Sequence, residues 1–492
     1  MDEEQDLREA IFYNKSTTEE TVSTILKPET RPKSINTFLY LTAVIADLMA
    51  FAAGVSFAWS SPMLPKLDGS KDPDHNPLGR PITPSEASWI AGLVPLGAIF
   101  GPMAAGTLAD KIGRKGSLLV MAAVMTLSLL TTAFAKIIHL FYISRFLLGT
   151  ACGSVFSILP LFLVEIAESH NRGTVSCLSG IFVTSGFNFA FVVGPHLSVQ
   201  NFCLVCISPL VIFLVCFSIL GAESPVYLAS INDEKRLMTS LKKLRNNSAE
   251  EIQAEFRSIM KSVEQTDRRK GMIGQILASK RLRRALVISL GIIIFQQAAG
   301  VSAIISYMQT IFAAAGGSLS PEMYPVIVGT VQTVATALAS SLVDRLGRKV
   351  LLLASAVGMC ISVATLGVYF YLKNHQIQVD MISWVPVLSL VVFMMMFNIG
   401  LGPVPWVVIA ELFPPKMRST TTSLASFSCF MSSFIITLVF AAMSLHLGMA
   451  NCFFVLSLIC FCAGAFIFCF VPETKGKSLQ AIQRSLEGNT MD

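Results

Sequence analysis

Charged residues are scarce in this chain, and their scarcity excludes an ordinary soluble protein. Asp, Glu, Lys and Arg make up 14% of the 492 residues, hydrophobic residues make up 53%, and the mean hydropathy is +0.64. Soluble domains carry about 25% charged residues. The segments Leu118 to Ala135 and Phe453 to Val471 contain no charge, and each approaches the roughly 20 apolar residues that a bilayer-spanning helix needs. The composition predicts an all-α membrane protein embedded in a lipid bilayer.

Several patterns that carry chemistry are also missing. The 11 cysteines stand mostly in apolar runs at irregular spacings, so they predict neither a metal site nor a disulfide framework. We find no phosphate-binding loop and no pairing of a nucleophile with a base. An enzyme, an ATP-driven pump, a cofactor and a nucleic-acid partner are therefore not expected.

The apolar segments form two groups of six around a polar middle, which predicts 12 transmembrane helices. We expect spans near 38–61, 88–109, 116–135, 138–165, 174–195, 200–221, 284–313, 323–343, 350–372, 382–411, 419–442 and 448–471. The predicted units are a disordered tail at 1–37, a six-helix bundle at 38–222, a helical linker at 223–283, a second six-helix bundle at 284–471 and a tail at 472–492.

The placement of Lys and Arg predicts the orientation. With the N-terminus in the cytoplasm, 31 of the 37 cations lie in inside segments and 5 in outside loops. Cytoplasmic loops carry an excess of these residues. We therefore expect a multi-pass membrane protein with both termini and the linker in the cytoplasm, and our hypothesis for the membrane is the plasma membrane. The linker has helical spacing and mixed charge, so it is either a solvated connector or a helical lid that bridges the two halves.

An internal repeat relates the two halves. The motif Asp-x-x-Gly-Arg-Lys begins at Asp110 and again at Asp344, 234 residues later. A Glu stands seven residues before an Arg after span four and again after span ten, and an acidic residue follows both span six and span twelve. Repeats of this kind indicate two pseudo-symmetric copies of one six-helix unit.

Charges at matching helix ends suggest a gate. Acidic and basic groups on neighbouring helices can pair across the cytoplasmic mouth and separate when it opens, which biases a two-state element by a few kcal/mol. The alternative is that they snorkel and only set topology. We also expect one buried pair inside the first bundle, between Arg145 and Glu165. The predicted gate and salt-bridge residues are Asp110, Arg114, Arg145, Glu165, Arg172, Glu223, Asp344, Arg348, Glu411, Arg418 and Glu473.

These motifs resemble the sugar porter family of the major facilitator superfamily, from about residue 38 to residue 477. The first external loop, around Pro65 and Trp89, is similar to that of insect facilitated trehalose transporters. The matching segments are Gly106 to Lys115, Arg145 to Gly149, Pro160 to Gly173, Glu223 to Pro225, Gln296 and Gln297, Gly402 to Trp406, Glu411 to Arg418, and Pro472 to Gly476.

The resemblance implies a sugar site near the bilayer midplane, formed mostly by the C-terminal bundle. Amide side chains suit this role because they both donate and accept hydrogen bonds, and an indole offers a flat wall with one donor. Paired Gln residues in a membrane helix could instead bond neighbouring helices. The implied substrate-binding residues are Gln296, Gln297, Ser302, Gln332 and Trp406.

The chain departs from the family pattern where hydrogen-bonding groups are usual. Gly180 stands where mammalian glucose facilitators have Gln, Ser302 and Ser306 replace Asn and Tyr, and Cys429 and Phe430 replace Asn and Trp. We therefore keep open a substrate that is larger than a hexose, less hydroxylated, or not a sugar.

The energy source is predicted from one position in span one. Proton-coupled relatives carry an Asp where this chain has Ser60, which favours facilitated diffusion of trehalose or a hexose. Asp47 lies two turns into the same span and is a possible proton site, because an ionisable residue at that depth suggests a function. The alternatives are a carrier of another small polar metabolite, a proton-coupled sugar symporter, and, less favoured, a nutrient sensor that does not transport.

Overall fold

The computed structural model describes residues 36–69, 76–168, 171–246, 248–264, 272–317, 320–477 and 481–482. The tails predicted at 1–37 and 472–492 lie mostly outside these residues. Within them the chain is helical, in the 12-helix arrangement predicted from the sequence. Ten helical segments have the length and hydropathy of membrane spans, and Met323–Ala339 is a shorter apolar helix. One of the ten, Pro84–Phe134, is two spans joined at a kink.

The N-terminal bundle begins with α2 and α3, which only Trp59 separates, and ends after α7. Glu86 fixes the start of α4, because its backbone N–H donates to Thr83 Oγ1 (3.2 Å) and its carboxylate accepts from Thr83 N–H (2.8 Å). The elements are α2 (Thr37–Ala58), α3 (Ser60–Leu67), α4 (Pro84–Phe134), α5 (Ile138–Ile166), α6 (Arg172–Val193), η2 (Gly194–His196) and α7 (Val199–Leu220).

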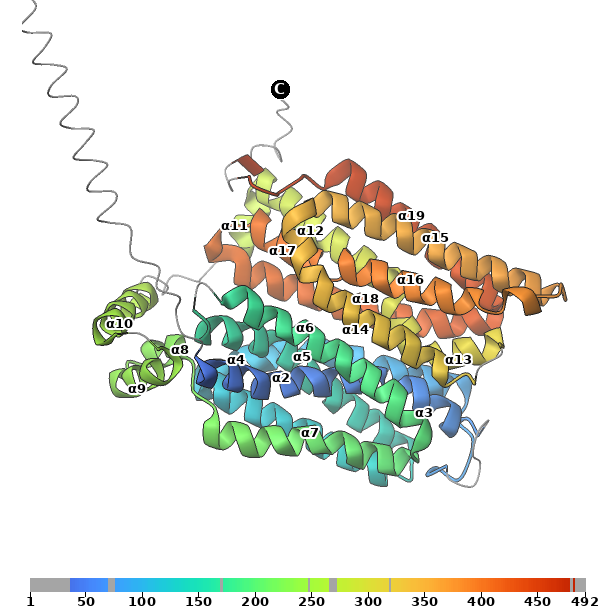
Figure 1. Cartoon of the computed structure of the whole chain (residues 1–492), viewed down its shortest axis with the longest axis horizontal. Coiled ribbons are helices and arrows are strands. Elements are labelled where there is room, and N and C mark those ends of the chain that lie inside the picture. The colour runs from blue at the N-terminus through green and yellow to red at the C-terminus, as the bar shows by residue number, and fades with distance from the viewer. Residues whose placement is uncertain are drawn as a thin grey trace, which may run out of the picture.

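The C-terminal bundle repeats this plan (Figure 1). Two of its spans are broken, one at Gly300 between α12 and α13 and one at residues 400–403 between α16 and α17. The elements are α12 (Lys280–Ala298), α13 (Val301–Ala315), α14 (Met323–Leu346), α15 (Arg348–Asn374), η3 (Asp380–Ile382), α16 (Val385–Ile399), α17 (Val404–Leu412), α18 (Pro415–His446) and α19 (Gly448–Phe470).

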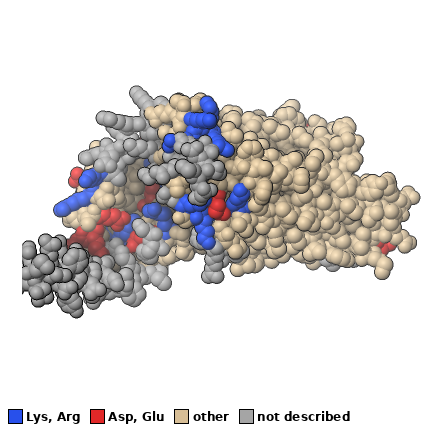
Figure 2. Space-filling model, turned by 90° about the horizontal axis from the view of Figure 1, so that it is seen from above, with Lys and Arg blue, Asp and Glu red and all other residues tan. Residues whose placement is uncertain are grey.

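Four helices connect the bundles: α8 (Pro225–Ser230), α9 (Glu234–Leu244), α10 (Ala249–Glu264) and α11 (Met272–Ala278). Helices α8 to α10 bury Leu237, Leu241 and Ile252 in a small core of their own. They lie at one end of the molecule, which we call the linker end, while α3 and α13 reach the opposite end, which we call the far end (Figure 1). Lys and Arg gather over the linker end, and most of the remaining surface in this view is uncharged (Figure 2).

The membrane-spanning surface is apolar. Ile219, Met103 and Phe461 expose 77%, 71% and 65% of their area. Inside the bundles, glycines let backbones touch: a Cβ at Gly54 of α2 would lie 2.1 Å from the carbonyl oxygen of Val183 in α6. Small residues at helix crossings are how membrane helices gain packing contacts, since lipid supplies no hydrophobic drive between them.

Candidate functional site

Gln296 occupies the last turn of α12 and faces the break in the span formed by α16 and α17. Its Nε2 donates to the carbonyl oxygens of Leu401 (2.6 Å) and Gly402 (2.8 Å). Because both partners are acceptors, the orientation of the amide is fixed. Its Oε1 is therefore an acceptor, and it is buried without a hydrogen-bond partner.

Gln297 belongs to a chain of hydrogen bonds that joins α12, α13 and α18. Its Nε2 donates to Cys429 Sγ (3.2 Å), and its Oε1 accepts from Ser302 Oγ (2.7 Å). Ser433 Oγ donates to Ser302 Oγ (2.7 Å). Both Gln side chains thus bond neighbouring helices, as one of the two interpretations of the sequence predicted. Of these two glutamines, Gln296 keeps an amide oxygen without a hydrogen-bond partner, whereas both ends of the Gln297 amide are used.

The other predicted site residues lie on α14 and α17 of the same bundle. Gln332 of α14 is buried, and its Oε1 has no hydrogen-bond partner. One turn later Thr336 Oγ1 donates to Asn398 Oδ1 (3.0 Å) of α16. Trp406 of α17 is half-buried against the main core. Sequence reasoning missed Asn398, although a lone amide inside the apolar run of span ten was a signal of the same kind as Gln332.

Aromatic rings from both bundles meet where the bundles face each other. The rings of Phe57 (α2), Phe156 (α5) and Phe430 (α18) lie within 6.1–6.5 Å of one another, and we call them the aromatic triad. Phe430 directly follows Cys429, so the triad stands beside the Gln297 chain and joins the two bundles. At Gly180 of α6, an added Cβ would lie 3.3 Å from Thr336 Cγ2 of α14, so the bundles also approach each other there.

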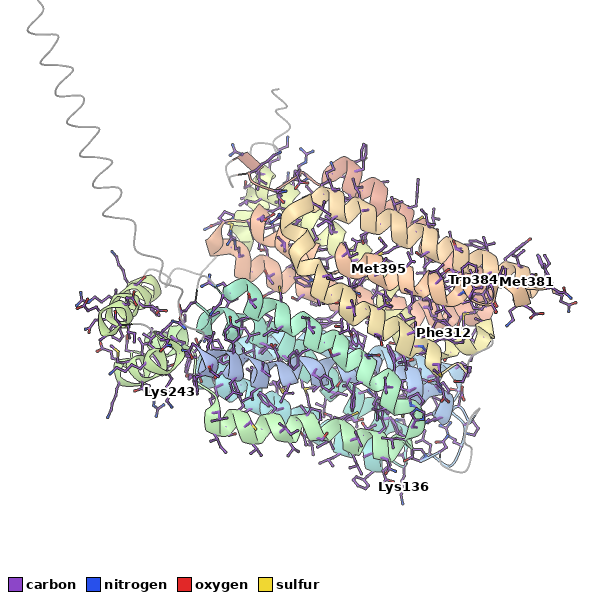
Figure 3. All side chains as sticks on the ribbon, in the orientation of Figure 1. Lys136, Lys243, Phe312, Met381, Trp384 and Met395 are labelled. Atoms are coloured by element: carbon purple, nitrogen blue, oxygen red, sulfur yellow. The ribbon has the colours of Figure 1, made fainter. Side chains whose placement is uncertain are left out.

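The bundles touch each other in the far-end half. Ser61 of α3 accepts from the backbone N–H of Gln309 in α13 (3.1 Å), and Asn188 of α6 donates to Thr330 of α14 (3.2 Å). Trp89 packs on Phe434 at 6.1 Å. Figure 3 labels the two ends: Lys243 lies at the linker end, whereas Lys136 and Trp384 lie toward the far end.

A charge cluster closes the linker end of the N-terminal bundle. Arg114 donates from Nε and Nη2 to the two carboxylate oxygens of Glu165, at 3.0 Å each. Ser224 Oγ also donates to Glu165. Glu223 Oε1 accepts from the backbone N–H groups of Arg114 (2.9 Å), Lys115 (3.1 Å) and Ser224 (2.9 Å). The cluster joins α4, α5 and the start of α8.

Gly113 makes this geometry possible. Its φ of 83° lies in the left-handed region, where glycine carries no Cβ penalty. A Cβ there would lie 2.4 Å from Glu223 Oε2. The kink at Gly113 therefore turns the chain between two spans and exposes the backbone donors that Glu223 binds.

The C-terminal bundle carries the matching cluster. Arg348 donates to Glu411 Oε1 from Nε (3.2 Å) and Nη2 (3.1 Å). Glu473 accepts from the backbone N–H groups of Arg348 and Lys349, at 3.1 Å each. Gly347 has a φ of 92° in the place of Gly113. The repeat found in the sequence is therefore a repeat of hydrogen-bond geometry.

In this structure two of the predicted gate pairs form inside the bundles, and pairing across the mouth in another state stays a prediction. Arg114 pairs with Glu165 and Arg348 with Glu411, so both pairs lie within a bundle. Asp110, Arg172 and Arg418 are exposed, and Arg418 donates to the carbonyl of Phe413 (3.2 Å). The side chain of Asp344 lies outside the described residues.

The two acidic anchors differ in burial. Burial raises the pKa of Glu223 even though three backbone N–H groups and Arg114 act against it. Burial also acts to raise the pKa of Glu473, but the N–H groups of Lys475, Arg348, Lys349 and Thr474 outweigh it and lower that pKa. The same hydrogen-bond motif thus holds two carboxylates with opposite pKa shifts.

The prediction that Arg145 pairs with Glu165 is wrong. Both residues belong to α5, where 20 residues separate them by about 30 Å at 1.5 Å per residue. Arg145 instead lies on the ring of Trp59, with its Cζ 3.4 Å from the ring centroid. Its side chain is fully buried, and its Nε and Nη2 have no hydrogen-bond partner.

Asp47 is buried in α2, where Ser179 Oγ of α6 donates to its Oδ1 at 2.6 Å. Its Oδ2 has no hydrogen-bond partner. The hydrogen bond from Ser179 therefore joins α2 to α6 and leaves one carboxyl oxygen of Asp47 unused.

Arg245, at the end of α9, attaches the linker to the N-terminal bundle and was not predicted. It donates from Nε and Nη2 to Glu255 of α10 (2.9–3.1 Å) and from Nη1 to the carbonyl of Ile166 at the end of α5 (2.6 Å). The sequence did not identify Arg245, because the segment around it contains many charged residues and a buried arginine cannot be told from its exposed neighbours.

Comparison with known proteins places the chain in a recognisable group. Residues 34–486 match the family described as "Sugar (and other) transporter". The facilitated trehalose transporter Tret1 of Anopheles gambiae is 32% identical over 489 residues, which are 99% of this chain and 60% of the relative. This chain thus spans about 60% of the length of that relative. Tret1 of Polypedilum vanderplanki is 33% identical over 94% of this chain and 91% of its own.

Solved structures share the fold. The inward-open xylose transporter XylE from E. coli has a TM-score of 0.74 at 22% identity, over 91% of this chain and 99% of its own. The proton:xylose symporter XylE bound to 6-bromo-6-deoxy-D-glucose has a TM-score of 0.70 at 22% identity, over 92% of this chain and 100% of its own. These matches agree with a major facilitator fold.

Proposed function

The chain belongs to the sugar transporter family, and from this premise we propose that it carries a small sugar, trehalose or a hexose, across a membrane by facilitated diffusion. The observation that supports this best is the pair of buried amide oxygens without partners, on Gln296 and Gln332. A buried acceptor costs about 1–3 kcal/mol when it is left unpaired. Hydroxyl groups of a sugar would offset that cost, because each can donate.

The linker end faces the cytoplasm in this proposal, and the membrane is the plasma membrane. Lys and Arg gather at that end of the molecule, beside Asp and Glu (Figure 2), and cytoplasmic loops carry an excess of cations. The hydrogen bonds between the bundles, Ser61 with Gln309 and Asn188 with Thr330, lie in the opposite half, which supports a carrier closed toward the outside. Transport would proceed by rocking of the bundles about the central site.

The charge clusters would brace the bundles during that motion. Each cluster ties three neighbouring helix ends of one bundle together, so each bundle can move as a unit. A direct role in opening the cytoplasmic mouth stays a prediction for the gate residues. It would require the same side chains to change partners between the two states.

Proton-coupled symport is a second candidate, and Asp47 motivates it. A carboxyl group beside Ser179 could exchange a proton when the packing of α2 and α6 changes. A non-sugar polar metabolite is a third candidate, because the residues at 180, 429 and 430 lack the usual hydrogen-bonding groups.

The test is uptake of radiolabelled trehalose and glucose into cells that express the chain at their surface. We expect saturable uptake of at least one of them, and loss of it in Gln296→Ala and Trp406→Ala. No uptake of either sugar by surface-exposed protein would contradict the proposal. An inward proton gradient that drives accumulation would replace facilitated diffusion with symport.

A further inference from the structure

The walls of the site differ in chemistry. The C-terminal bundle offers amides and hydroxyls, with free acceptors on Gln296 and Gln332. The aromatic triad, with Phe57 and Phe156 from the N-terminal bundle and Phe430 from the C-terminal bundle, offers no hydrogen-bonding group. Phe156 exposes 37% of its area, and Phe57 and Phe430 are half-buried. Phe156 contacts rings from α2 and α18, so that part of its surface borders the space between the bundles.

A fully hydroxylated substrate fits this asymmetry poorly. A hydroxyl group placed against phenyl rings loses water without gaining a hydrogen bond, which is unfavourable. An apolar group in the same place is removed from water and gains ring contacts.

Gly180 strengthens the asymmetry. A longer side chain at that position would meet Thr336 of α14, because even a Cβ would come within 3.3 Å of it. The N-terminal bundle therefore offers no polar side chain at position 180 to bind a second sugar ring.

We propose that the preferred substrate is a sugar joined to an apolar group, an aryl or alkyl glycoside, with its sugar on the amides of α12 and α14 and its apolar group on the aromatic triad. This inference rests on the proposed sugar transport. It narrows the substrate class from free sugars to glycosides, and it assigns specificity to Phe430 and its two partners.

The test compares phenyl β-D-glucoside with methyl β-D-glucoside as competitors of radiolabelled glucose in liposomes that contain the purified full chain. Both probes block the anomeric hydroxyl, so they differ only in the apolar group. We expect phenyl β-D-glucoside to compete about tenfold more strongly, the range in which a hydrophobic pocket discriminates. Phe430→Ala should remove that advantage, so that the two glucosides compete about equally with glucose.

Two variants make the outcome decisive. Phe461→Ala removes an equally large ring from the lipid-facing surface of α19, where Phe461 is 65% exposed, and should keep the advantage. Phe57→Ala tests the triad from the other bundle, should Phe430→Ala fail to fold. Equal competition by both probes, or equal losses for both in the triad variants, would overturn the inference and leave sugar transport standing. Transport of neither glucose nor trehalose by folded protein would instead remove the proposed function itself.

Discussion

The two equivalent charge clusters allow a prediction about stability in which the pair in one bundle serves as the control for the pair in the other. Arg114 and Glu165 expose 12% and 7% of their side chains and share two parallel hydrogen bonds of 3.0 Å. Removing one partner of a buried pair leaves an uncompensated charge, at a cost of about 3–5 kcal/mol. We expect Arg114→Met to lower the free energy of unfolding by about 3 kcal/mol, the low end of this range, because the pair is not fully dry.

The double variant should recover most of this loss. Arg114→Met with Glu165→Leu removes both charges, so no unpaired carboxylate stays buried. The measurement is an unfolding titration of the purified protein in mixed micelles, for the wild type, both single variants and the double variant. The four values give the coupling energy of the pair.

The C-terminal cluster is the matched control. Arg348 and Glu411 expose 13% and 27% of their side chains, and Arg348 donates to a single oxygen of the Glu411 carboxylate. Solvent screens this pair more strongly, so we expect a coupling of about 1 kcal/mol. Equal coupling in the two halves, or stronger coupling in the C-terminal half, would refute the reasoning. If these variants left the free energy of unfolding unchanged but altered the access of a thiol reagent to a cysteine on the outer side, a role of the charges as a gate would be favoured instead.

Three further predictions follow from single side chains. Asp47→Asn should leave sugar uptake and its pH profile unchanged if transport is facilitated diffusion, and loss of a pH-dependent component would establish proton coupling. Glu473→Gln should lower the melting temperature at neutral pH. Because the folded-state pKa of Glu473 is lowered, its contribution to stability is present above the ordinary pKa of 4.5 and is lost as the pH falls through the folded-state pKa. The melting temperatures of the wild type and the variant should therefore converge at that low pH. Arg245→Met should detach α9 and α10, measured as faster proteolysis of the linker than in Arg257→Met, with Arg257 exposed on α10; equal rates would show that Arg245 is not the anchor.

Charge pairing was the least accurate part of the sequence analysis. The repeat located Arg114 and Arg348 correctly at equivalent helix ends, because the motif recurs in sequence. It could not tell whether partners belong to the same bundle, since that depends on how the helices cross. The error over Arg145 was avoidable, because two charges that are 20 residues apart on one helix are too far apart to meet.

For the candidate site too, the positions of the residues were predicted from the sequence but their hydrogen-bond partners were not. The resemblance to the sugar porter family implied Gln296, Gln297 and Gln332 as site residues, and they lie on two helices of one bundle. It could not predict that Gln296 binds carbonyl oxygens 105 and 106 residues away. Those carbonyls are free because the span breaks between α16 and α17, and a break of this kind depends on tertiary packing.

The environment of Arg145 bears on the energy source. A buried guanidinium stays charged, and its stacking on Trp59 at 3.4 Å compensates part of the charge. The residue after Trp59 is Ser60, and Asp47 lies 13 residues before it, about 20 Å along α2. Asp47 therefore cannot serve Arg145 as a counter-charge, and neither residue can transfer a proton to the other directly. Arg145 and Asp47 therefore act independently, and the uptake measurement on Asp47→Asn decides between symport and facilitated diffusion.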